Sequence, residues 1–208
     1  MDPSDYTLTY LALGDSYTIG QSVPEDERWP VQLVAKLRGA GIPIADAEII
    51  ARTGWTTAEL MRAIEEQYQP KTYDLVSVLV GVNDQYRGYP IEEYRTQFHE
   101  ILAFALSAAG GDPSRMIVLS IPDWGVTPYA EGLDLAKIAA EIDAFNAVAR
   151  EESAAAGVQY FDITPISREA LQNRDLIAGD GLHPSGEMYA GWVKAVFPYV
   201  FDLLSAED

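Results

Sequence analysis

The sequence has no cysteine and only two histidines among its 208 residues, and these absences restrict its chemistry. Without cysteine it forms no disulfide, no thiolate metal site and no cysteine nucleophile. A histidine base, if one is used, must be His99 or His183. Few side chains are therefore available to activate a nucleophile.

Basic residues are also scarce, because 14 Lys and Arg stand against 32 Asp and Glu, for a formal net charge of −18. Proteins bind nucleic acids and anionic membranes through clustered Lys and Arg, and these residues are scattered here. We therefore expect neither nucleic acid nor a membrane as a partner. The acidity is typical of a soluble protein, and adaptation to high salt is the alternative explanation.

No apolar run is long enough to span a bilayer, although 48% of the residues are hydrophobic. Residues 1–5 are acidic and no apolar segment follows them, unlike a secretory signal peptide, so a cytoplasmic location is expected. The length predicts a single domain that extends across residues 1–208, and no linker, repeat or charge block divides the chain. The oligomeric state stays open.

Short apolar runs alternate with segments of helical periodicity along the chain. Strands are expected at 7–13, 48–51, 74–80, 115–121 and 158–163. Helices are expected from Trp29–Pro30 to about 39, after the Thr56–Glu59 capping box, at 90–109, around 135–149 and around 188–200. Strands separated by amphipathic helices predict an α/β fold with a parallel sheet covered on both faces.

Polar motifs follow the predicted strands. Gly14-Asp15-Ser16 follows the first strand, and residues 52–55, 81–84 and 122–125 follow the next three. A further motif, 180–183, precedes the last helix. Because ligands bind such sheets at the carboxyl ends of the strands, these loops are expected to form one site.

Ser16, His183 and Asp180 have the chemistry of a nucleophile, a base and the partner of that base. A serine hydroxyl needs a base to remove its proton, and histidine suits this role near neutral pH. Asp180 precedes His183 by three residues, so a tight turn could place its carboxylate on the imidazole. The alternatives are that Ser16 caps a helix and Asp180 caps a turn. His99 falls within a helical pattern and is expected at the surface.

Three groups are candidate donors to an oxyanion: the Ser16 N–H, the Gly54 N–H and the Asn83 side-chain amide. The missing Cβ of Gly54 would let a substrate approach the backbone closely. We expect Asp84 to brace its loop and Asp15 to have a structural role.

Aromatic residues on the strand-end loops are candidates to line a substrate pocket, with loop packing as the equal alternative. They are Tyr17, Trp55, Tyr86, Tyr89, Trp124 and Tyr129. The residues expected to line the substrate pocket are Tyr17, Trp55 and Trp124. The two tryptophans lie closest in sequence to the predicted site.

These motifs, in this order, resemble the four blocks of the SGNH (GDSL-type) hydrolase superfamily. The blocks are Gly14-Asp15-Ser16, Gly54, Gly81-Val82-Asn83-Asp84 and Asp180-Gly181-Leu182-His183-Pro184. The first block reads G-D-S-Y rather than G-D-S-L, at a position that varies within the superfamily. The resemblance extends over about residues 7–200. It implies a flavodoxin-like, three-layer α/β/α fold with a five-stranded parallel sheet of order 2-1-3-4-5.

The resemblance also implies hydrolysis of esters or thioesters through an acyl-enzyme, without a metal or an organic cofactor. It assigns Ser16 as nucleophile, His183 as base, Asp180 as its partner, and Ser16, Gly54 and Asn83 as oxyanion donors. We expect a small-molecule ester with a short acyl group, because the chain is compact and has no long lid insertion. The alternatives are a thioesterase or lysophospholipase, a carbohydrate deacetylase, and a non-catalytic binding module on a flavodoxin-like scaffold.

Overall fold

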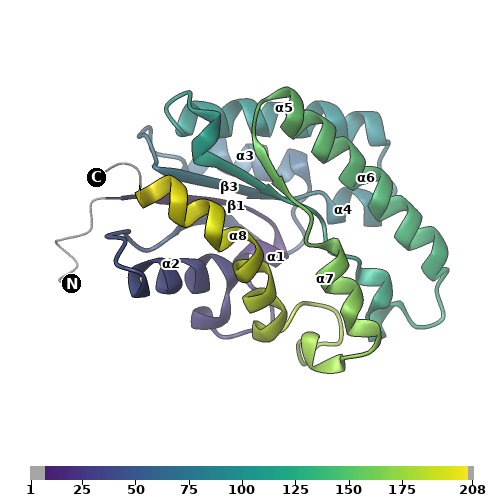
Figure 1. The fold of residues 1–208 in the computed structure, drawn as a ribbon. Helices are drawn as coiled ribbons and strands as arrows, with labels where there is room; N and C mark the ends of the chain where they lie inside the picture. The colour runs from purple at the N-terminus through teal and green to yellow at the C-terminus, as the bar shows by residue number, and fades with distance from the viewer. Residues whose placement is uncertain (1–7, 206–208) are drawn as a thin grey trace.

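The computed structural model describes residues 8–205, in which five strands form one parallel sheet (Figure 1). The strands are β1 (Tyr10–Gly14), β2 (Glu48–Ala51), β3 (Leu75–Leu79), β4 (Met116–Leu119) and β5 (Gln159–Phe161). Their order is β2-β1-β3-β4-β5, and every neighbouring pair is parallel. The predicted fold class and strand order are confirmed.

Four of the five strands are shorter than the apolar runs that predict them, and only β2 has the predicted bounds. Thr7, the predicted start of the first strand, lies outside the described residues, as do the acidic residues 1–5. The run predicted to end at Ile121 stops being a strand at Leu119. The Ile121 N–H donates to the Asn146 side-chain oxygen at 2.7 Å, so this apolar residue already belongs to the loop.

Helices cover both faces of the sheet and make three layers (Figure 1). On one face α2 (Trp29–Gly39) packs against α8 (Gly186–Ser205), and on the other α5 (Ile91–Ala108) lies between α3 (Thr57–Gln67) and α6 (Leu135–Ala155). The short helices are α1 (Ser16–Ile19), α4 (Val82–Tyr86) and α7 (Thr164–Arg168), with 3-10 turns η2 (Glu25–Glu27), η3 (Pro113–Arg115), η4 (Trp124–Val126), η5 (Pro128–Ala130), η6 (Glu169–Leu171) and η7 (Arg174–Leu176). No helix in this described range is long and apolar enough to cross a membrane.

Local sequence signals explain where two of the main helices begin. Helix α3 starts with the predicted capping box, in which the Thr56 hydroxyl accepts from the Glu59 N–H and the Glu59 carboxylate accepts from the Thr56 N–H. Pro30 lies in the first turn of α2, where its missing N–H leaves no hydrogen bond unmade. Both signals lie within four residues, which is why the sequence predicts them well.

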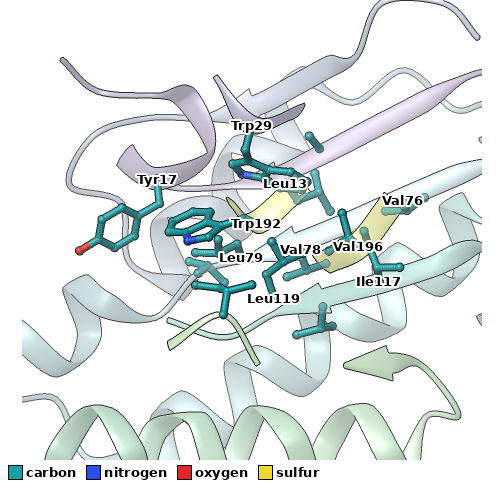
Figure 2. Packing of buried hydrophobic residues seen from close by; sticks show 14 of the residues in the cluster. Leu13, Tyr17, Trp29, Val76, Val78, Leu79, Ile117, Leu119, Trp192 and Val196 are labelled. Atoms are coloured by element: carbon teal, nitrogen blue, oxygen red, sulfur yellow. The ribbon is translucent and has the colours of Figure 1, made fainter. Parts of the chain in front are cut away.

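The core between the sheet and helices α2 and α8 holds the first strand rigidly in place. Figure 2 shows Leu13 of β1 and Val78 of β3 meeting Trp29 of α2 and Trp192 of α8. Both indoles are fully buried, and every residue of β1 is buried too. Burying each large apolar side chain contributes about 1.5–3 kcal/mol. The carboxyl end of β1, where the serine motif begins, is therefore a fixed platform.

Candidate active site

Ser16 is the first residue of α1, directly after the turn that ends β1. Asp15, not Ser16, caps this helix, because its side-chain Oδ1 accepts from the Tyr17 N–H at 3.0 Å. A Cβ on Gly14 would overlap the Thr18 side chain, so a glycine is needed for the strand to turn this tightly into the helix. The cap interpretation of Ser16 is therefore wrong, and its hydroxyl is available for other contacts.

His183 lies in the loop before α8, with its Nδ1 2.6 Å from Asp180 Oδ2. The other oxygen, Oδ1, accepts from the backbone N–H groups of Leu182 and His183, both at 3.0 Å. Asp180 therefore does both things that the sequence left open: it caps the turn and it contacts the imidazole. The two functions agree, because the capped turn fixes the carboxylate beside the ring.

The carboxyl group of Asp180 is held in its ionised form. Partial burial opposes the charge, but hydrogen bonds from Ser22, from the His183 N–H and imidazole, and from the Leu182 N–H outweigh it and hold the pKa of Asp180 well below its usual range. An ionised carboxylate only accepts hydrogen bonds. The proton of the contact with Nδ1 therefore belongs to the imidazole, which leaves the other ring nitrogen, Nε2, as the acceptor.

A cavity of about 110 Å³ brings the predicted residues together. It is lined by Ser16, Tyr17, Val82, Asn83, Tyr86, Trp124, Tyr129, Leu182 and His183. His99, the other histidine, is exposed on α5 and contacts Glu152 at 3.1 Å. Across residues 8–205, no three His, Asp or Glu side chains converge as a metal site would require.

Asn83 joins this cavity to the turn that carries Gly54. Its amide nitrogen donates to the Trp55 carbonyl at 2.8 Å, and a second N–H remains on the same nitrogen. Gly54 and Trp55 adjoin Asn83 but are not among the lining residues. A Cβ on Gly54 would meet only the Arg87 guanidinium, at an ordinary contact distance of 4.0 Å, yet its φ of +87° lies in the left-handed region that favours glycine. Backbone conformation therefore explains this glycine independently of any substrate.

The aromatic residues that line the cavity only partly match those predicted to line a substrate pocket. Tyr17 and Trp124 line it, whereas Tyr86 and Tyr129 take the place expected for Trp55. The hydroxyls of Tyr86 and Tyr129 hydrogen-bond at 2.8 Å, and the Tyr86 ring meets Trp124 edge to face at 5.4 Å. Both tyrosines belong to the six aromatic residues on the strand-end loops. Distance in sequence from a motif was a poor guide to which of them would converge.

Tyr17 supports the imidazole from the core side. Its ring makes edge contacts with His183, at 5.9 Å between centroids, and with Trp192, at 6.4 Å. Figure 2 shows its hydroxyl pointing away from Trp192, while burial raises the pKa of this phenol far above its usual range. Tyr17 therefore stays neutral and links the site to α8 through packing.

Two buried polar groups brace the neighbouring loops. Asp84 accepts from the Thr57 N–H at 3.1 Å and from the Thr57 hydroxyl at 2.6 Å, which ties α4 to the start of α3. This confirms the bracing role expected for Asp84. Trp124 is fixed in turn, because its indole N–H donates to the Gln85 side-chain oxygen at 2.8 Å.

Asp15 is a buried carboxyl group next to the nucleophile candidate. Burial raises its pKa to about 8, the negative charge of Asp84 adds to the shift, and the hydrogen bond from the Tyr17 N–H opposes it. The carboxyl group is therefore largely protonated at neutral pH, which agrees with the structural role expected for it.

Replacing Asp15 by asparagine should stabilise the protein more at pH 8 than at pH 5. The unfolded chain ionises this group near pH 4, whereas the folded protein keeps the proton until about pH 8. The folded state binds more protons across this window, so the contribution of Asp15 to stability falls as the pH rises. Urea unfolding at both pH values should show the gain of Asp15→Asn over wild type growing by at most about 4 kcal/mol. Asp26→Asn, at an exposed carboxylate, is the control, and a gain that does not change with pH would contradict the assignment.

Five parallel strands in the order β2-β1-β3-β4-β5, with helices on both faces, define a three-layer class of α/β proteins. Residues 12–190 match the GDSL-like Lipase/Acylhydrolase family, and the chain belongs to it. An arylesterase from Vibrio mimicus is 26% identical over 117 residues, which are 55% of this chain and 56% of that protein. This chain thus matches about half the length of that relative.

Solved structures share the fold along nearly the whole chain. Axe2, an acetylxylan esterase from Geobacillus stearothermophilus, has a TM-score of 0.73 at 18% identity, with 94% of each chain covered. TesA has a TM-score of 0.70 at 18% identity, with 94% of this chain and 99% of that chain covered. At this level of identity the likeness is one of fold.

Proposed function

We propose that this protein is a serine esterase that cleaves small carboxylic esters through an acyl-enzyme on Ser16. The observation that carries the proposal is that Ser16 and His183 line one cavity while the ionised Asp180 lies 2.6 Å from the imidazole. Membership of the GDSL-like family supports ester hydrolysis as the reaction class.

In this mechanism the Ser16 hydroxyl attacks the carbonyl carbon of the ester while His183 Nε2 takes its proton. The imidazolium that forms is stabilised by Asp180 and then protonates the departing alkoxide. Water deprotonated by the same imidazole attacks the acyl-enzyme, releases the carboxylic acid and returns the proton to Ser16. Each proton thus passes through one ring nitrogen, and Asp180 keeps its negative charge throughout.

The oxyanion formed at each attack would be met by three donors. Ser16 begins α1, so its N–H has no acceptor within that helix. The second Asn83 amide hydrogen remains after the bond to Trp55, and the Gly54 N–H lies in the adjoining turn. Such donors stabilise the transition state more than the ground state, and loss of one typically lowers the rate by about 10²–10³-fold.

The size and the walls of the cavity support a small acyl group. A volume of about 110 Å³ is well below the 300–1,000 Å³ or so of pockets for drug-sized ligands. The hydrogen-bonded hydroxyls of Tyr86 and Tyr129 connect the end of α4 to η5 beside it. Deacetylation of acetylated sugars is the second candidate, because these two half-exposed rings would present stacking faces and hydroxyls to a polyol. A thioesterase or lysophospholipase uses the same chemistry, but its long acyl chains would need more space.

A series of p-nitrophenyl esters from acetate to palmitate tests the size of the acyl group. We expect kcat/KM to be highest for acetate or butyrate and to fall by about tenfold or more at octanoate. Tyr86→Ala should raise the relative rate on octanoate by removing one wall, while Tyr89→Ala, at a residue outside the lining, should leave the profile unchanged. A maximum at palmitate would contradict the proposal and favour a lipid substrate.

A further inference from the structure

Ser22 has an unusual backbone conformation for a residue with a side chain. Within residues 8–205 it is the one non-glycine residue with a positive φ, at +68°. This left-handed region is disfavoured for every residue with a Cβ and is normally occupied by glycine. Ser22 lies in the segment 20–28 between α1 and α2, close to the nucleophile candidate in sequence. A local strain of this kind is a reason to ask what the side chain does.

The Ser22 hydroxyl donates to Asp180 Oδ2 at 2.7 Å, across 158 positions of sequence. This is the same oxygen that lies 2.6 Å from His183 Nδ1. The backbone donors to Asp180 reach the other oxygen and come from its own turn. The Asp180 side chain is 30% exposed, so water competes for its lone pairs. The hydroxyl of Ser22 therefore restrains the oxygen on which the orientation of the imidazole depends.

The segment around Ser22 also touches the other parts of the site. The Gln21 N–H donates to the Ser16 carbonyl at 3.0 Å, and the Gln21 side chain accepts from the Thr53 hydroxyl at 2.6 Å, next to Gly54. Ser22 thus joins the loop of His183 to a segment already attached to the nucleophile and to the glycine turn. Such a link would set the spacing between base and nucleophile.

We propose that Ser22 is a positioning residue that holds Asp180 against His183 and links the base loop to the nucleophile loop. The inference rests on the esterase function proposed above. A glycine at this position would relax the backbone but would lack the hydroxyl. The strained serine is therefore explained by its bond to Asp180.

Two substitutions of Ser22 should show that its effect on catalysis is separate from its effect on stability. One should raise Tm and lower kcat, and the other should lower Tm and leave kcat nearly unchanged. Ser22→Gly relieves the backbone and removes the hydroxyl, so Tm should rise while kcat on p-nitrophenyl acetate falls about fivefold to tenfold with KM unchanged. Ser22→Thr keeps the hydroxyl but adds a β-branch in the left-handed region, so Tm should fall while kcat stays within about twofold of wild type. A residue with a purely structural role would move both quantities in the same direction.

Ser114→Gly is the matched control, because it also removes an exposed hydrogen bond from a serine to an aspartate. Ser114 Oγ donates to Asp112 at 2.6 Å, just before β4 and at the amino ends of the strands. The kcat of this variant should equal that of wild type. An active wild-type enzyme with an unchanged kcat in Ser22→Gly would overturn the role of Ser22 and leave the esterase proposal standing. A wild-type protein that hydrolyses no ester and reacts with no fluorophosphonate would overturn both.

Discussion

Replacing Ser16 by alanine is expected to lower kcat/KM for p-nitrophenyl acetate by at least about 10⁴-fold. The substitution removes one oxygen atom, and with it the acyl-enzyme, while the Ser16 N–H and the other oxyanion donors remain. Residual hydrolysis should therefore exceed the rate in water without approaching that of the enzyme. Stopped-flow or steady-state release of p-nitrophenol measures the loss directly.

The fold should survive this substitution, because Asp15 and not Ser16 caps α1. The Tm of Ser16→Ala is therefore expected to lie close to that of wild type. Ser114→Ala, which alters a serine just before β4 that is not among the residues lining the cavity, should keep full activity. Activity of Ser16→Ala within about tenfold of wild type would exclude Ser16 as the nucleophile.

Replacing His183 by alanine should cost about as much, because it removes the group that accepts the serine proton. Nucleophile and base act as a unit, so the double variant of Ser16 and His183 should be hardly slower than either single variant. Additive losses would indicate that the two residues act in separate steps.

His99 provides the matched control for this experiment. It is the other histidine of the chain, and it contacts Glu152 on the surface rather than the cavity. His99→Ala should keep wild-type kcat and KM. If His99→Ala loses activity and His183→Ala does not, the proposed base is wrong.

Much of the fold could be predicted because its signals are local. The interior strand β1 is apolar along its length and buried by the two helical layers, and the capping box before α3 lies within four residues. The strand order was available only through the resemblance to a known superfamily. Pattern alone predicts a parallel sheet and places the motifs at its carboxyl edge, without ordering the strands.

The site was predictable where chemistry limits the choice of residue. With two histidines in the chain, the choice of base is limited to His99 and His183. Ser16 is predicted from its place directly after an apolar strand, together with the other motifs. The environment of Asp180 is less predictable, because the sequence is compatible with either a turn cap or a contact with the imidazole. The structure combines them, since one carboxylate oxygen caps the turn and the other meets the imidazole.

Contacts between distant segments could not be predicted from a single sequence. The pairing of Tyr86 with Tyr129 joins α4 to η5, and the bond from Ser22 to Asp180 crosses 158 positions of sequence. No residue type or spacing marks Ser22, because its left-handed φ follows from where the loop must pass. Such features depend on tertiary geometry and become visible only when the segments are placed together.

The central claim, that Ser16 forms a covalent acyl intermediate, is tested most directly by reaction with a fluorophosphonate and mass spectrometry of the digested protein. We predict one adduct, on the peptide that contains Ser16, which is absent from Ser16→Ala and forms far more slowly in His183→Ala. An adduct on another serine, or ester hydrolysis in a protein that forms no adduct, would contradict the account.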